Sequence, residues 1–153
     1  MNALANLLGE DDIQLDWDVA NKVHLFEQVA QLIHHRHGVR AALVSGALSR
    51  RESIGSTALG HGVAIPHARV DGLPQGSGLF IRSRLALPFD APDGKPVSLI
   101  LVLLIPTEAT AEHLRLLAAA AALFDDRNVR DQLHQADDAV AVWRILAGLP
   151  PAP

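Results

Sequence analysis

The apolar run at residues 97–105 places the strongest constraint on how this chain folds. It reads Val-Ser-Leu-Ile-Leu-Val-Leu-Leu-Ile and is closed by Pro106. A strand with one face in water alternates apolar and polar side chains, whereas this run is apolar on both faces. It is also far shorter than the ~20 residues that an apolar helix needs to cross a bilayer, as is the second apolar run, at 116–124. We therefore expect no membrane insertion, and a strand covered on both sides by other elements.

Helical patterns on both sides of this run supply the covering layers. Residues 18–36 carry apolar side chains at three- and four-residue spacing and are followed by Gly38, a helix stop. Further helices are predicted at residues 39–51, 111–124 and 126–135, with a last one from an N-cap at Asp137 to Leu146. Shorter strands are predicted at residues 63–65 and 79–85, and a loop at 52–62. The order predicts an α/β fold, a layered α/β/α sandwich with a mixed central sheet flanked by helices.

Length, charge and cysteine content narrow the function classes. A chain of 153 residues suits one domain, here residues 1–153. The absence of cysteine excludes a disulfide scaffold, a thiolate nucleophile and a cysteine-ligated zinc site. A formal net charge of -4 gives no electrostatic reason to expect a nucleic acid partner. The first residues lack the basic and apolar regions of a signal peptide, so we expect a cytoplasmic protein.

The segment at residues 55–69 contains the best candidate for chemistry. His67 follows a short apolar run and Pro66, behind a loop of small residues in which Gly60 and Gly62 allow close approach of a ligand. The spacing predicts that His67 lies just past the end of a strand, where open α/β sheets bind ligands. An imidazole is a good nucleophile near neutral pH. The pattern alone leaves two readings open: a reactive histidine, or one held by backbone groups at a strand end.

Residues 51–68, Arg-Glu-Ser-Ile-Gly-Ser-Thr-Ala-Leu-Gly-His-Gly-Val-Ala-Ile-Pro-His-Ala, resemble the active-site motif of the type-2 EIIA domains of the bacterial phosphoenolpyruvate:sugar phosphotransferase system, the fructose/mannitol family. The resemblance continues more loosely at residues 88–90, 97–106 and 112–114. It covers about residues 5–148, so the family's domain would be the core of the chain.

The resemblance implies a phosphocarrier that needs no cofactor and no metal. His67 would accept a phosphoryl group on Nε2 from an HPr-like or NPr-like protein, and would pass it to a sugar-specific EIIB or regulate partner proteins. Arg51 would neutralise phosphate oxygens, and His113, the family's second histidine, would donate a hydrogen bond to them. Ser56 and Thr57 would be further phosphate donors. Without the resemblance, these four residues read as a helix-end cation, a histidine at a helix start and two turn formers.

Three alternatives stay open at this point. His61, His67 and His113 form a candidate three-histidine zinc site, since His61 stands where the family often has asparagine. A pure interaction module would keep the fold and bind without phosphate. Within the phosphocarriers, residues 54–57 are more similar to the nitrogen-regulatory branch than to the free-standing fructose or mannitol EIIA proteins. Besides His61, the sequence departs from the family pattern at Ala68, where many members have glycine.

Overall fold

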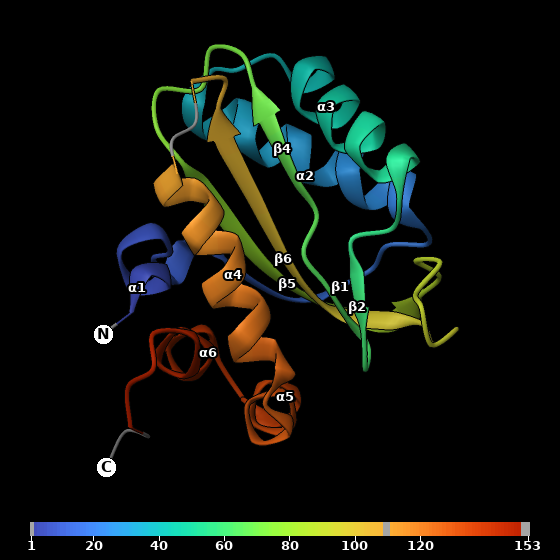
Figure 1. Cartoon of the computed structure of the whole chain (residues 1–153), viewed down its shortest axis with the longest axis vertical. Coiled ribbons are helices and arrows are strands. Elements are labelled where there is room, and N and C mark those ends of the chain that lie inside the picture. The colour runs from blue at the N-terminus through green and yellow to red at the C-terminus, as the bar shows by residue number, and fades with distance from the viewer. Residues whose placement is uncertain (1, 109–110, 151–153) are drawn as a thin grey trace.

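Strand β6 (Val97–Pro106) runs through the middle of the molecule and is buried on both faces, as the sequence predicts. The computed structural model describes residues 2–108 and 111–150 (Figure 1). Alternate side chains of β6 enter two separate cores. Ile100, Val102 and Leu104 belong to one cluster, and Leu99, Leu101 and Leu103 belong to the other.

The sheet around β6 is mixed, which confirms the predicted architecture. Its other strands are β1 (Ile13–Trp17), β2 (Ala58–Gly60), β3 (Val63–Ala64), β4 (His67–Val70) and β5 (Ser77–Leu87). Over the described residues the strand order is β1-β5-β6-β3-β2, and β4 also pairs with β6. β5 is antiparallel to β6, whereas β3 and β4 are parallel to it.

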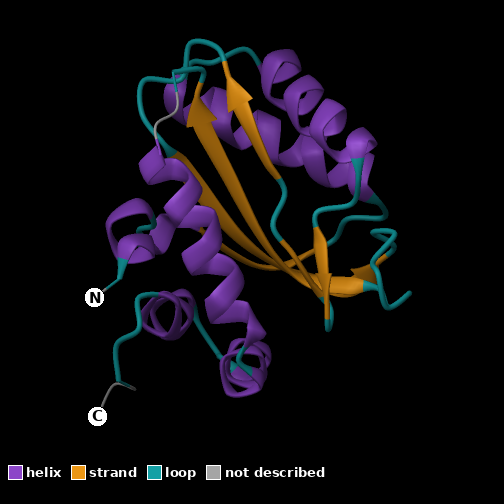
Figure 2. Ribbon diagram, in the orientation of Figure 1, coloured by secondary structure: helices purple, strands orange, loops and turns teal. Residues whose placement is uncertain are grey.

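Helices cover both faces of the sheet (Figure 2). α2 (Lys22–His37) and α3 (Ala41–Ile54) pack on one face. The other face is covered by α1 (Ala3–Leu7), α4 (Ala111–Asp125), α5 (Arg127–Gln135) and α6 (Ala139–Leu146). The result is the predicted three-layer α/β/α sandwich (Figure 1). Within the described ranges, no helix has the length and apolar character needed to cross a membrane.

Capping side chains set the helix starts and correct two predicted boundaries. The helix expected from residue 18 begins at Lys22, because the Asn21 side chain accepts a hydrogen bond from the backbone N–H of His24. It ends as predicted at Gly38, whose φ of 71° is left-handed. The cap of the last helix is Asp138 rather than Asp137.

Three further differences concern the predicted loop and the N-terminal segment. α3 continues through Ile54 instead of stopping at residue 51, so the first part of the predicted loop at 52–62 is helical. Residues 58–60 of that loop form β2. α1 and β1 are absent from the sequence prediction, because each is only five residues long.

Candidate active site

The strand is interrupted at Ile65 and Pro66, between β3 and β4, and His67 is the first residue of β4. As predicted, His67 lies past a strand end, because β3 ends at Ala64; the prediction did not include β4, in which parallel pairing with β6 resumes at His67. Val63 lies opposite Leu99, and His67, four residues further on, lies opposite Leu103, so both strands share one register. Val63 packs in the core beneath α4. Because side chains alternate along a strand, His67 is on that same side of the sheet.

Both ring nitrogens of His67 have partners. Nδ1 is 2.9 Å from the backbone carbonyl oxygen of Ile65. Because a carbonyl only accepts, the hydrogen is on Nδ1, and the lone pair of the neutral ring is on Nε2. The Nε–H group of Arg51 donates to that lone pair at 3.3 Å. The imidazole is half-buried, so these two bonds fix its orientation while part of the side chain stays exposed to solvent.

Arg51 reaches His67 from the last turn of α3. Its Nη1 donates to the carbonyl oxygen of Gly55 at 2.9 Å, while its Nε donates to His67. A guanidinium has five N–H groups in one plane, so the group that holds the histidine has further donors for an anion. The structure thus places Arg51 against His67, and the predicted contact of Arg51 with phosphate oxygens stays a prediction.

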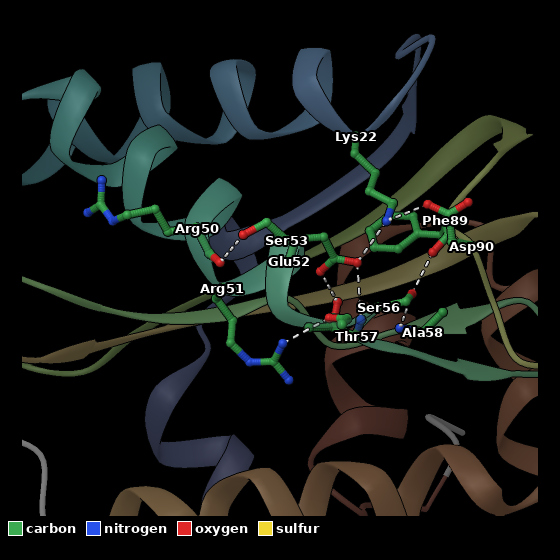
Figure 3. A network of polar contacts seen from close by, with 11 residues as sticks. Lys22, Arg50, Arg51, Glu52, Ser53, Ser56, Thr57, Ala58, Phe89 and Asp90 are labelled. Carbon is green, nitrogen blue, oxygen red and sulfur yellow. Dashed lines mark hydrogen bonds and ion pairs between the residues drawn. The ribbon is translucent and has the colours of Figure 1, made fainter.

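The loop residues Ser56 and Thr57 donate their hydroxyl hydrogens within the protein (Figure 3). Thr57 Oγ1 donates to Glu52 Oε2 at 2.7 Å. Ser56 Oγ donates to the carbonyl oxygen of Phe89 and accepts from the N–H of Ala58. Both residues therefore shape the loop in this structure, and their predicted contact with a phosphoryl group stays a prediction.

Two charged residues of this network have no counterpart in the sequence prediction. The carboxylate of Glu52 is buried and accepts from Lys22 Nζ at 3.0 Å. Lys22 also pairs with Asp90 at 3.2 Å and lies 5.0 Å from the centre of the Phe89 ring (Figure 3). Lys22 and Glu52 are 30 positions apart in the sequence, so no local spacing signals their contact.

His113 is half-buried in the first turn of α4. It lies against Gly76, where an added Cβ would be 3.5 Å from its Nε2. It also lines a cavity of about 350 Å³ with neighbours that include Gln75, Glu112 and Asn6. α4 covers the face of the sheet on which His67 lies. A shared phosphate contact of the two histidines stays a prediction.

The zinc alternative is not supported by the arrangement of the histidines. His61 is in the turn between β2 and β3, where its backbone N–H donates to Asp93 at 2.8 Å. Among residues 2–108 and 111–150, no three His, Cys, Asp or Glu side chains are grouped so that they can hold a metal ion.

A family model described as phosphoenolpyruvate-dependent sugar phosphotransferase system, EIIA 2, matches residues 6–148. The chain belongs to this EIIA family. The predicted resemblance is thereby confirmed, and the relatives include nitrogen regulatory proteins. One from Bradyrhizobium diazoefficiens is 36% identical over 149 residues, which is 97% of either chain. The crystal structure of nitrogen regulatory protein IIA-Ntr from Neisseria meningitidis has 43% identity and a TM-score of 0.90, and the match covers 95% of this chain and 99% of that one.

The EIIA fold extends to more distant proteins. One is the matched chain in the complex of enzyme IIAMTL and phosphorylated enzyme IIBMTL from Escherichia coli, which is 19% identical and has a TM-score of 0.77. The match covers 92% of this chain and 97% of that one, and it shows a likeness of fold. A fructose-specific EIIA component from Haloferax volcanii is 35% identical over 101 residues, 66% of each chain. The chain is thus an EIIA-type protein related to nitrogen regulatory proteins.

Proposed function

We propose that this protein is a histidine phosphocarrier, a phosphotransferase component in which His67 takes a phosphoryl group from a histidine-phosphorylated, HPr-like or NPr-like protein. The orientation of the His67 ring carries the proposal. The Ile65 carbonyl binds the Nδ1 hydrogen at 2.9 Å, which puts the lone pair on Nε2, where it can attack once the Arg51 N–H that donates to it at 3.3 Å moves aside.

In the proposed transfer the incoming phosphorus replaces the Arg51 N–H at Nε2 of His67. The Nε2 lone pair forms the new N–P bond while the N–P bond of the donor phosphohistidine breaks and its electron pair returns to the donor ring. Such transfers pass through a loose transition state with charge on three oxygens, so fixed donors stabilise it most. Positive charge that develops on the His67 ring is stabilised by the Ile65 carbonyl, which accepts from Nδ1.

Arg51 has two roles in this proposal. Before transfer its Nε–H donates to Nε2 and holds the ring. Once Nε2 is bonded to phosphorus its lone pair is used, and the same guanidinium lies beside the phosphoryl oxygens. His113 is the proposed second donor, as in the family motif, and Ser56 and Thr57 contribute through the shape of the loop.

The relatives favour a regulatory role over sugar transport. Proteins named nitrogen regulatory match nearly the whole chain at 36% and 43% identity, whereas fructose-specific components match 66% of it at 35% identity or 94% of it at 25%. We therefore propose that the phosphorylation state of His67 controls the binding of target proteins in the cytoplasm. A fructose- or mannitol-type EIIA that passes its phosphate to an EIIB is the second candidate.

The test is phosphoryl transfer in a reconstituted system. The protein is incubated with phosphoenolpyruvate, enzyme I and an HPr-like carrier, and intact mass is followed for an acid-labile gain of about 80 Da, one phosphoryl group. His67→Ala removes the gain, whereas His37→Ala, at an exposed histidine, keeps it. Label on His67→Ala would show that the site is elsewhere, and no label on the wild type would favour the interaction module. Efficient transfer to an added EIIB would favour the sugar branch.

A further inference from the structure

Glu52 carries a buried negative charge directly beside the candidate active site. Its side chain is 6% exposed, and it follows Arg51 in the last turn of α3. Oε1 accepts from Lys22 Nζ at 3.0 Å and from the backbone N–H of Thr57 at 3.1 Å. Oε2 accepts from the Thr57 hydroxyl at 2.7 Å. A buried carboxylate is costly unless it is paired, and this one has three donors.

One chain of hydrogen bonds leads from Glu52 to Nδ1 of His67. Glu52 holds Thr57 by both its backbone N–H and its hydroxyl (Figure 3). The carbonyl of Thr57 accepts from the N–H of Ile65 at 3.0 Å. The carbonyl of the same Ile65 accepts from His67 Nδ1 at 2.9 Å. The position of the carbonyl that fixes the histidine tautomer therefore depends on Thr57.

A second chain leads from the same helix end to Nε2. The N–H of Gly55 donates to the backbone carbonyl of Glu52 at 3.2 Å. The carbonyl of Gly55 holds Nη1 of Arg51 at 2.9 Å, and Nε of Arg51 donates to His67 Nε2 at 3.3 Å. Gly55 and Thr57 are separated by one residue, so a shift of this short segment moves both chains at once.

Lys22 supplies the counter-charge from a different helix. It is the first residue of α2, and its side chain is 19% exposed. Its contacts with Asp90 and with the ring of Phe89 fix it over the segment that follows β5. The Lys22–Glu52 pair thus joins α2 and α3 to the loop at residues 55–57 (Figure 3).

We propose that Glu52, charge-balanced by Lys22, is a positioning residue that orients both nitrogens of His67 for phosphoryl transfer. The inference rests on the proposed function for its kinetic consequence, but the orientation itself is measurable without any transfer. The carboxylate of Glu52 acts on Thr57 directly, and on Gly55 and Arg51 through movement of the 55–57 segment, and does not itself contact the phosphoryl group.

Variants at Glu52 and Thr57 test the inference. Glu52→Gln keeps the size of the side chain but replaces one accepting oxygen with an NH₂ group. That group would face the donors of Lys22 or Thr57. Thr57→Val keeps the shape of the side chain and removes its hydroxyl, whereas Thr57→Ser keeps the hydroxyl and removes the methyl group. Val142→Ala is the control, since it truncates a fully buried side chain in the other core cluster and lowers stability without touching either chain.

The first measurement is the rate of phosphoryl transfer from the phosphorylated HPr-like carrier over a range of carrier concentrations. We expect kcat to fall about tenfold or more in Glu52→Gln and about three- to tenfold in Thr57→Val, with KM changed less than about twofold. Thr57→Ser should recover part of the rate that Thr57→Val loses, and Val142→Ala should stay within about twofold of the wild type.

The second measurement is the ¹⁵N NMR spectrum of the His67 ring, which reports the tautomer in the folded protein alone. The wild type should show hydrogen on Nδ1, and Glu52→Gln and Thr57→Val should show a mixture of tautomers. Wild-type tautomer and rates within about twofold in both variants would overturn the inference and leave the proposed function intact. If the wild type takes no phosphoryl group, the proposed function fails and the NMR spectra still decide the inference. If Glu52→Gln does not fold, the two Thr57 variants decide it.

Discussion

Arg51 offers the sharpest test of the active-site geometry. Its Nε is 3.3 Å from Nε2 of His67, so at least one guanidinium N–H is within reach of an oxygen on a phosphoryl group bound there. A hydrogen bond to a charged group contributes about 1.5–3 kcal/mol, and each ~1.4 kcal/mol is tenfold in rate. Arg51→Ala should therefore slow transfer to His67 by about 10- to 150-fold.

The lysine variant separates charge from geometry. Arg51→Lys keeps the positive charge, but a single ammonium cannot reproduce the fork that holds the Gly55 carbonyl and His67 together. The transfer rate of Arg51→Lys should lie between those of the wild type and Arg51→Ala, about three- to tenfold below the wild type.

The assay is single-turnover quenched flow with excess phosphorylated carrier. Urea denaturation of each variant serves as the control, because Arg51 is only half-buried and its loss should cost less than about 1 kcal/mol of stability. If Arg51→Ala transferred at a rate within about threefold of the wild type, the guanidinium would have no part in stabilising the phosphoryl group.

Three predictions concern stability. Leu101→Ala removes a fully buried side chain from the core beneath α4, and urea denaturation should show a loss of about 2–5 kcal/mol. Arg82→Met should cost about 1–3 kcal/mol in the same assay, since Arg82 donates to three backbone carbonyls at the end of α5. The backbone N–H groups of His61 and Lys95 lower the pKa of Asp93 from its usual 3.8. The folded state therefore favours the ionised carboxylate, so the stability advantage of the wild type over Asp93→Asn should be present above pH 3.8 and shrink as the pH falls through the lowered pKa.

Much of the sandwich was predictable because its central strand has a distinctive composition. A strand with apolar side chains on both faces requires two covering layers, and β6 has them. Helix starts were less predictable because several residues near each start are suitable caps. Asp18 and Asn21 are both suitable, and the bond from the His24 N–H to Asn21 decides the start of α2. Asp137 and Asp138 present the same choice at α6.

The site was predictable where the motif is local and unpredictable where it depends on tertiary contact. Arg51 and His67 belong to one continuous motif, and the structure brings them together. The strand ends before His67 as predicted, but β4 was missed, because Pro66 lacks an N–H while its carbonyl still accepts from Leu103 at 2.9 Å and pairing resumes. Lys22 was missed because its contact with Glu52 depends on how α2 and α3 pack.

The shared register of β3 and β4 has a consequence for how the family can vary in length. Val63 and His67 lie opposite Leu99 and Leu103, so the two strands behave as one strand with an interruption at Ile65 and Pro66. Inserting or deleting one residue there would turn the imidazole to the α2–α3 side of the sheet, away from α4. The turn at residues 92–95, where every residue is exposed and outside the strands, has no such register to keep. Natural insertions should therefore accumulate in that turn and be absent between residues 63 and 67.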